Sequence, residues 1–234
     1  MKKTLILIAT CLLGFAAAAQ DVTIYGDVFM PTGNYGKSYM NVTSTNYTPY
    51  TAITEQGYNL GGAGWGWGTG IQLSRMVNRS GFGWVADLGF RMGWLNADMR
   101  SYFNEYGISH NSVGITKAPK YFNIPLLVGP SFTFDAASWL DIYLALEIGF
   151  DVRIISDACY TASKWVDYDA EVPFAFRVAG GFVINDHIVV EANWSWFDEQ
   201  PVFATAYGFD SYPVSGPYGF LETMQFALRF GYRF

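Results

Sequence analysis

Long stretches of this chain alternate between apolar side chains and other side chains, which is the two-residue period of a β-strand. The clearest stretch covers residues 139–154, where every even-numbered position from Leu140 to Ile154 is apolar. The odd-numbered positions carry the charged side chains of this stretch, namely Asp141, Glu147, Asp151 and Arg153. Strands of soluble proteins usually have about 5–6 residues. A tilted strand needs about 9–11 residues to cross a bilayer, so this stretch is long enough to do so.

The same alternation recurs along the rest of the chain. It predicts further strands at residues 22–30, 65–73, 82–94, 121–132, 172–184, 188–196 and 223–234, which makes eight strands with residues 139–154. One face of these strands is bulky and aromatic, and the other consists of Gly, Ala and isolated charges. A soluble sandwich would instead present a polar face to water. The alternation therefore indicates strands whose apolar face contacts lipid.

Because one face of the strands contacts lipid, the eight strands are expected to close into a ring. Hydrocarbon cannot satisfy the unpaired backbone groups of an open sheet edge. An eight-stranded barrel is just wide enough for its own side chains to fill the interior. We therefore predict an all-β fold, an eight-stranded antiparallel up-and-down transmembrane β-barrel. A one-residue slip in register would turn Arg177 or Arg229 into lipid, so the sequence predicts which face points inward.

The gaps between the predicted strands alternate in length. The long gaps are residues 31–63, 96–120, 155–171 and 197–221, and the short ones are 75–81, 133–138 and 185–187. Outer-membrane barrels have short periplasmic turns and longer extracellular loops. This arrangement would place both termini in the periplasm. The shortest gap, Asn185-Asp186-His187, has the composition of a tight turn.

The first nineteen residues have the features of a secretory signal peptide. Lys2 and Lys3 precede the apolar stretch of residues 5–15, and four alanines follow at residues 16–19. This order predicts that residues 1–19 are removed and that residues 20–234 form the barrel domain.

Composition excludes or disfavours two other classes of protein. The chain is 51 % hydrophobic and 15 % charged, which excludes disorder, and its 20 acidic against 14 basic residues disfavour nucleic acid as a partner.

The charged positions on the inward face predict a network of ion pairs that fills the lumen. Asp87 and Arg91 are four residues apart and share that face. Charges in a narrow space of low dielectric must be paired. The near balance of acids and bases indicates a plugged interior and no large channel. The predicted network consists of Asp27, Asp87, Arg91, Asp141, Glu147, Asp151, Arg153, Arg177, Glu191, Arg229 and Arg233.

Candidate catalytic or metal-binding residues are few. His110 and His187 are the only histidines, and the predicted topology places them on opposite sides of the membrane. We therefore predict no metal site, no cofactor and no catalytic residue. The alternative is a lipid-modifying enzyme that uses His110 beside Ser109 and Ser112. A catalytic triad is defined by geometry and not by neighbours in sequence. The sequence alone therefore does not separate a non-enzymatic barrel from a lipid-modifying enzyme.

The long gaps are rich in tyrosine and tryptophan, which supply large rigid contact areas in recognition surfaces. A surface ligand or a partner on a host or another cell is therefore a candidate. The loop residues that we expect to make such contacts are Tyr102, Tyr106, Tyr160, Trp165, Tyr207 and Tyr212. The alternative is a structural role, in which these side chains pack against one another above the barrel.

The end of the chain resembles that of bacterial outer-membrane proteins in general. These chains end in an aromatic residue and have apolar residues at every second position before it, here Phe226, Leu228, Phe230, Tyr232 and Phe234. The resemblance implies that this strand is the signal read by the barrel-assembly machinery. The whole mature chain looks like the eight-stranded group that includes OmpX and the membrane domain of OmpA. Residues 121–127 are also similar to a strand motif of PorT-like barrels, although Asn123 stands where those have an acidic residue.

The sequence thus predicts a monomeric, non-enzymatic barrel in the lipid of the bacterial outer membrane, with a role in envelope structure or surface interaction. Three alternatives stay open. The chain could be a narrow conduit or binding site for small or hydrophobic solutes, a lipid-modifying enzyme, or a soluble periplasmic barrel. No part of the sequence names a ligand.

Overall fold

The computed structural model describes residues 21–32, 63–76, 81–97, 117–161, 164–207 and 214–234. Within these ranges the chain forms ten strands. Their bounds are β1 (Asp21–Thr32), β2 (Ala63–Met76), β3 (Phe82–Leu95), β4 (Lys120–Ala137), β5 (Leu140–Ile155), β6 (Ala158–Thr161), β7 (Lys164–Tyr168), β8 (Phe174–Ile184), β9 (Ile188–Tyr207) and β10 (Val214–Arg233). The described ranges contain no helix with the length and apolar character needed to cross a membrane.

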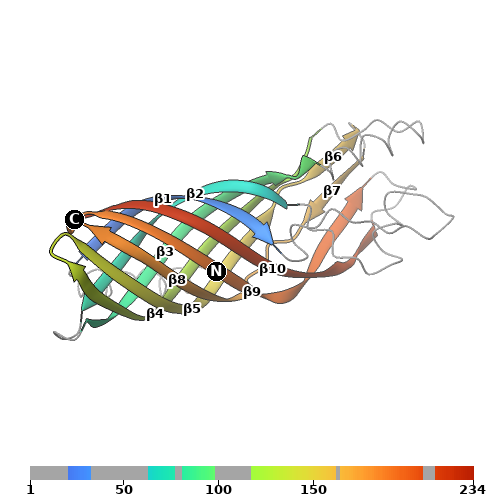
Figure 1. Ribbon diagram of the computed structural model, residues 1–234. Coiled ribbons are helices and arrows are strands. Elements are labelled where there is room, and N and C mark those ends of the chain that lie inside the picture. The colour runs from blue at the N-terminus through green and yellow to red at the C-terminus, as the bar shows by residue number, and fades with distance from the viewer. Residues whose placement is uncertain (1–20, 33–62, 77–80, 98–116, 162–163, 208–213) are drawn as a thin grey trace.

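Eight of these strands close into a ring (Figure 1). Each strand pairs antiparallel with its neighbours in the order β1-β2-β3-β4-β5-β8-β9-β10. The ring closes where β1 pairs with β10, from Thr23 opposite Arg233 to Thr32 opposite Met224. The predicted fold, an eight-stranded closed antiparallel barrel, is therefore confirmed.

The strand ends differ from the prediction most clearly in the last hairpin. Residues 197–221 are not one long loop, because β9 runs on to Tyr207 and β10 begins at Val214. Residues 155–171 likewise contain the β6–β7 hairpin, and β7 pairs with the far part of β9. Alternation of apolar residues marks only the part of a strand that has lipid on one side. Backbone pairing needs only a neighbouring strand, so it continues beyond that point.

Together β6, β7 and the far parts of β9 and β10 form a sheet that continues past the ring at one end of the barrel (Figure 1). We call it the extension sheet, and we call this end of the barrel the extension end. The register within it runs from Trp165 opposite Tyr207 to Tyr168 opposite Ala204. The barrel is thus built differently at its two ends.

The opposite end, which we call the turn end, has tight connections. Only residues 138–139 separate β4 from β5, so Trp139 belongs to this turn and not to the strand predicted from residue 139. Asn185 and Asp186 have φ angles of 49° and 64°. Asn and Asp tolerate this left-handed conformation better than most residues do. The predicted tight turn at residues 185–187 is confirmed.

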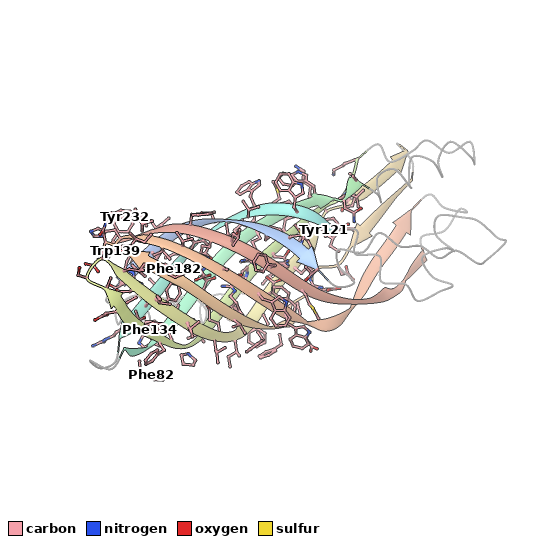
Figure 2. The ribbon with its side chains drawn as sticks, in the orientation of Figure 1. Phe82, Tyr121, Phe134, Trp139, Phe182 and Tyr232 are labelled. Carbon is pink, nitrogen blue, oxygen red and sulfur yellow. The ribbon has the colours of Figure 1, made fainter. Side chains whose placement is uncertain are left out.

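The two faces of the wall differ as the alternation predicted (Figure 2). On β5, the outward side chains of Leu146 and Ile148 are each 51 % exposed. The inward side chains that alternate with them are buried, with Ala145 3 % exposed and Glu147 fully buried. The outward apolar positions of β5 extend from Ile142 to Ile154, which is roughly 30 Å of height for a strand tilted by about 40°. We call this exposed apolar surface the apolar belt. Its height matches the hydrocarbon thickness of a bilayer, about 30 Å.

Candidate functional site

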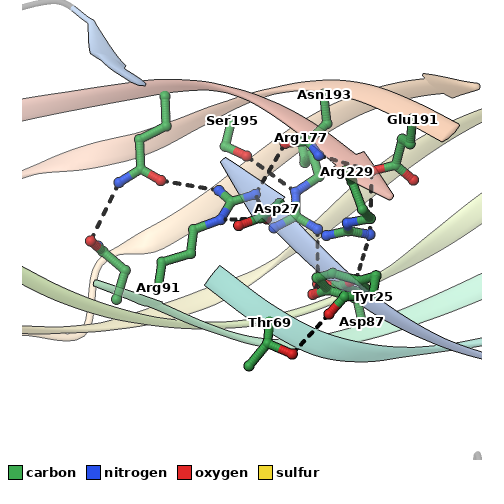
Figure 3. Close-up of polar contacts among 12 residues, drawn as sticks. Tyr25, Asp27, Thr69, Asp87, Arg91, Arg177, Glu191, Asn193, Ser195 and Arg229 are labelled. Atoms are coloured by element: carbon green, nitrogen blue, oxygen red, sulfur yellow. Dashed lines mark hydrogen bonds and ion pairs between the residues drawn. The ribbon is translucent and has the colours of Figure 1, made fainter. Parts of the chain in front are cut away.

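A buried cluster of charged side chains occupies the middle of the lumen (Figure 3). Asp87 of β3 lies at its centre and accepts hydrogen bonds from Arg177 Nη1 at 2.9 Å and Arg229 Nη1 at 2.8 Å. The Tyr25 hydroxyl donates a third hydrogen bond to Asp87, at 3.0 Å. All three charged side chains are completely buried. One carboxylate therefore joins strands β1, β3, β8 and β10 across the barrel.

Two further carboxylates flank this cluster. Glu147 Oε2 lies 3.4 Å from Arg177 Nη1, and Glu191 Oε1 lies 3.3 Å from Arg229 Nη1. The Tyr143 hydroxyl donates to Glu191 at 2.6 Å. Each guanidinium group is thus shared between two carboxylates. A guanidinium carries five N–H donors in a planar fork, which suits such bridging. We refer to Asp87, Glu147, Arg177, Glu191 and Arg229 as the central ion cluster.

A second ion pair lies nearer the extension end. Arg91 donates from Nε at 3.0 Å and from Nη2 at 2.7 Å to the same oxygen of Asp27. Its other hydrogen bonds go to the neutral amides of Gln225 at 3.0 Å and Asn193 at 3.3 Å. Asp87 and Arg91 therefore share a face but bind different partners. Cross-strand partners lie closer to each side chain than the residue four positions along its own strand.

A third polar group lies on the inward face near the extension end. The Asn123 side-chain amide donates to Asp151 at 2.5 Å. Arg153 Nη1 lies 3.5 Å from Glu171 Oε2. Glu171 precedes β8, and its backbone exchanges two hydrogen bonds with that of Arg153, of 2.8 and 2.9 Å. This segment therefore extends the pairing between β5 and β8 beyond the start of β8, and it brings in a carboxylate that the prediction did not include.

Burial raises the pKa of Glu171 to about 7, because the charged carboxylate loses contact with water. The nearby Arg153 guanidinium acts in the opposite direction and favours the charged form. Asp169, two residues earlier, raises the pKa further by like-charge repulsion. The end of the lumen thus holds a carboxyl that changes charge near neutral pH.

Two predicted members of the network lie outside it. Asp141 and Arg233 are only partly buried and lie at the turn end. Asp141 there faces Asp135 across the β4–β5 pair. Arg233 lines a cavity of about 30 Å³ together with Gln72, Ser74 and Thr133. Asp141 and Arg233 thus lie at the turn end and are less buried than the other predicted members, because alternation gives the face of a strand and not the depth at which water reaches it.

Glycines on the inward face of β2 make room for these charged groups. A Cβ added at Gly68 would collide with the Asp27 carboxylate, and one at Gly70 would collide with the Tyr25 hydroxyl. Strand β2 contributes little volume to the lumen, so long side chains from β1 and β3 fill the space in front of it. The glycines on the inward face of β2 therefore leave the space that the long side chains of neighbouring strands occupy.

The sequence analysis missed the neutral partners of the ion pairs. Each of them lies at an inward position of its strand, the same position that identified the charges. They are Tyr25, Gln72, Asn123, Tyr143, Asn193, Ser195 and Gln225, and all are buried. Alternation could therefore have found these residues. Glu171 could not have been found in this way, since it lies in an irregular segment.

The buried charges hold one another and leave little room for other chemistry. The charged side chains buried in the lumen are Asp27, Asp87, Glu147, Asp151, Glu191, Arg91, Arg153, Arg177 and Arg229. In the described part of the chain, no group of three His, Cys, Asp or Glu residues is arranged to hold a metal ion. The arrangement can therefore cross-link the wall electrostatically and close the lumen to solutes.

The remaining predicted residues fall into two groups. Tyr102, Tyr106, His110 and Tyr212 lie outside the described residues. Tyr160, Trp165 and Tyr207 belong to strands of the extension sheet. At the chain end, Phe226, Leu228, Phe230, Tyr232 and Phe234 are all exposed on the apolar belt. His187 stacks on Tyr232, with ring centroids 5.3 Å apart, and its Nδ1 lies 3.0 Å from the Arg233 carbonyl oxygen.

Comparison with known proteins adds structural neighbours and no sequence relatives. The chain matches no protein-family model and no curated protein sequence. It is similar to the outer membrane protein OprG from Pseudomonas aeruginosa, with a TM-score of 0.48 and 11 % identity over 92 % of this chain and 96 % of that chain. It is also similar to Neisserial surface protein A, with a TM-score of 0.45 and 9 % identity over 91 % of this chain and 94 % of that chain.

A third similar structure is Ail, the attachment invasion locus protein of Yersinia pestis, solved with the heparin analogue sucrose octasulfate. Its TM-score is 0.38 and its identity 11 %, over 92 % of this chain and 97 % of that chain. At these identities the likeness concerns the fold alone. The chain is an eight-stranded antiparallel closed barrel, and its structural neighbours are small bacterial outer-membrane barrels.

Proposed function

We propose that this protein spans the bacterial outer membrane as a filled, non-conducting and non-enzymatic barrel that presents its extension sheet for surface interactions. The observation that carries the proposal is the inverted polarity of the wall. Ile148 is 51 % exposed beside the fully buried Glu147. In water this arrangement would expose apolar surface and bury charge, whereas in lipid both faces match their surroundings.

The orientation follows from the two ends of the barrel. Outer-membrane barrels turn tightly on the periplasmic side and extend on the outer side. The turn end contains the connections at residues 138–139 and 185–187, and β1 begins and β10 ends there. We therefore place both termini in the periplasm and the extension sheet outside the cell. The terminal strand, with its outward Phe226 to Phe234, is the segment that we expect the assembly machinery to bind.

A role as an open pore is disfavoured by the central ion cluster. Its side chains bridge opposite walls of the barrel, and Asp87, Arg177 and Arg229 have no exposed surface. A solute would have to separate buried ion pairs in order to pass. The cavity at the turn end has a volume of only about 30 Å³, which is room for little more than a water molecule. These features support a closed barrel whose working surface lies at its end.

The extension sheet supports a role in surface interaction. Strands β9 and β10 each have 20 residues, about twice what a membrane-spanning strand requires. The excess lies beyond the apolar belt, where the far part of β9 pairs with both β7 and β10. A sheet in that position is in contact with the medium, and it carries Tyr160, Trp165 and Tyr207 on its strands. We expect it to contact a ligand or another cell.

The two parts of this proposal are tested separately. Planar bilayer recordings of the full chain should show no stable, large, ohmic steps, and such steps would overturn the closed lumen. For the surface role, Gln200 and Leu221 are paired in the β9–β10 ladder. Residues 201–220 can therefore be replaced by an Asn-Gly turn, which joins paired strands directly.

Bacteria that display the shortened chain should still carry a folded barrel, seen as heat-modifiable mobility in gels. They should lose attachment to one another and to an epithelial monolayer, measured against cells with the full chain and cells with an empty vector. Equal attachment by the shortened and full chains would contradict the surface role. So would a full chain that confers no attachment beyond the empty vector.

A further inference from the structure

An aromatic patch with one lysine, Lys120, lies on the outer wall of β2–β4 at the extension end, and a second lysine, Lys117, lies three residues earlier in the chain. Trp94 of β3 lies directly opposite Lys120 of β4, and both occupy outward positions. The Trp65 ring is 5.4 Å from the Trp94 ring. Lys117 and Lys120 are both exposed. We call this surface the Trp94–Lys120 patch, and deeper in the belt it continues into Phe90 and Phe122, whose rings are 6.0 Å apart.

The backbone of Lys120 is held by Ser156, which follows the end of β5. Its backbone N–H donates to the Ser156 hydroxyl at 2.9 Å, and its carbonyl accepts from the Ser156 backbone N–H at 2.9 Å. Lys120 thus begins β4 at the height where the apolar belt ends. Within the described residues, no carboxylate forms an ion pair with Lys117 or Lys120. Both ammonium groups are available to an external anion.

Charge at this end of the barrel is distributed unevenly. The described carboxylates of the extension end lie from the end of β5 to β9, at Asp157, Asp167, Asp169, Glu171 and Asp198. Asp157 is the member of this group nearest to Lys120 along the ladder, one residue beyond Ser156. Among the side chains that the structure describes at this end, the exposed lysines therefore lie beside β3 and β4 and the carboxylates lie from β5 to β9, and an anionic ligand would bind on the lysine side.

We infer that the Trp94–Lys120 patch binds a phosphorylated glycolipid of the outer leaflet. The inference rests on the proposed function, because it requires the extension end to lie at the outer surface. Lysine ammonium groups bind phosphate as point charges. Tryptophan prefers the boundary between hydrocarbon and headgroups. The phosphates would contact Lys117 and Lys120, and the acyl chains would lie over Trp65, Trp94, Phe90 and Phe122. The chain would thus carry a bound lipid on one side of the barrel.

The test uses the full mature chain inserted into phosphatidylcholine vesicles that contain about 5 mol % of bis-phosphorylated lipid A. The vesicles are dissolved in mild detergent, and the lipid A retained on the protein is counted by native mass spectrometry. Removing one lysine near an anionic surface should weaken retention about fivefold, so K120Q should retain markedly less and K117Q/K120Q less still. The charge-preserving K117R/K120R variant should retain wild-type amounts. R75Q, the same charge change at the turn end, is the matched control and should behave as the wild type.

Two results would overturn the inference while leaving the barrel intact. One is equal retention by K117Q/K120Q and the wild type. The other is equal retention of dephosphorylated lipid A, or of phosphatidylglycerol offered in its place. Heat-modifiable mobility of the same samples reports insertion. A wild-type chain that fails to insert would contradict the proposed function itself, whereas one that inserts without selecting lipid A would contradict only the lipid site.

Discussion

Glu147 and Ile148 are neighbours in β5, but their side chains lie in opposite environments. Glu147 is fully buried and lies 3.4 Å from the Arg177 guanidinium, whereas Ile148 is 51 % exposed on the apolar belt. A soluble protein would reverse the two. Successive side chains of a strand point to opposite faces, so a shift of one residue carries the chain from one environment to the other.

The difference shows that the two faces are stabilised by different physics. The belt needs only apolar character, since lipid is non-directional and accepts any such side chain. The lumen needs specific partners, because a buried charge without one is strongly destabilising. The inward face should therefore be sensitive to the loss of a single atom group, and the outward face should be sensitive only to a change of polarity.

Removing the central carboxylate should have the largest effect. D87A leaves Arg177 and Arg229 buried with one carboxylate each, Glu147 at 3.4 Å and Glu191 at 3.3 Å. Breaking a buried ion pair by removing one partner costs about 3–5 kcal/mol. Urea unfolding in lipid vesicles, followed by heat-modifiable mobility, measures the loss. D135A removes an exposed carboxyl and is the control. A loss no larger than that of D135A would mean that the central ion cluster contributes nothing.

A charge placed on the belt should have the next largest effect. I148R exposes a guanidinium to the middle of the hydrocarbon, which costs about 2–4 kcal/mol, and the penalty falls to about 0–1 kcal/mol near the interface. The same substitution at Ile142, closer to the turn end of β5, is the depth control. The measurement is unfolding in vesicles as above. Equal losses at the two positions would contradict the depth of Ile148 in the membrane.

The Asp27–Arg91 pair tests whether inward residues act through their partners. D27A and R91A should each destabilise the barrel, and the double variant should lose less than the sum of the two. Residues in direct contact show coupling energies of about 0.5–3 kcal/mol in such cycles. Unfolding of the four proteins in parallel measures this coupling. If the loss in the double variant equals the sum of the two single losses, the 2.7 Å contact between the two side chains contributes nothing to stability.

The smallest effect concerns Glu171, where the lumen meets water. Its pKa is raised from 4.5 to about 7, so the folded state favours the protonated carboxyl. The stabilisation is complete below pH 4.5 and is lost as the pH rises through 7. The two backbone hydrogen bonds between Arg153 and Glu171 should therefore open more often at pH 8 than at pH 5. Hydrogen exchange of these amides, corrected for the intrinsic rate, should show this change. E171Q should abolish it, and a pH dependence that persists in E171Q would assign it to another group.

Much of the fold could be predicted because the solvent imposes it. Alternation on β5 identified both faces, and Arg177 and Arg229 were placed inward by the same rule that placed Phe230 outward. The strand ends at Tyr207 and Val214 could not be predicted in this way. Beyond the belt both faces meet water, so neither face is required to be apolar and the alternation disappears while the backbone pairing continues.

The sequence by itself determined which side chains enter the lumen, because each strand must present one apolar face to hydrocarbon and the period of two leaves the other positions inside. Only the tertiary structure decided which of them bind one another. Asp87 and Arg229 are 142 positions apart, and Asp27 and Arg91 are 64 positions apart. Their contacts depend on closure of the ring and on the relative heights of strands that are not neighbours in the chain, and a linear pattern does not carry that information.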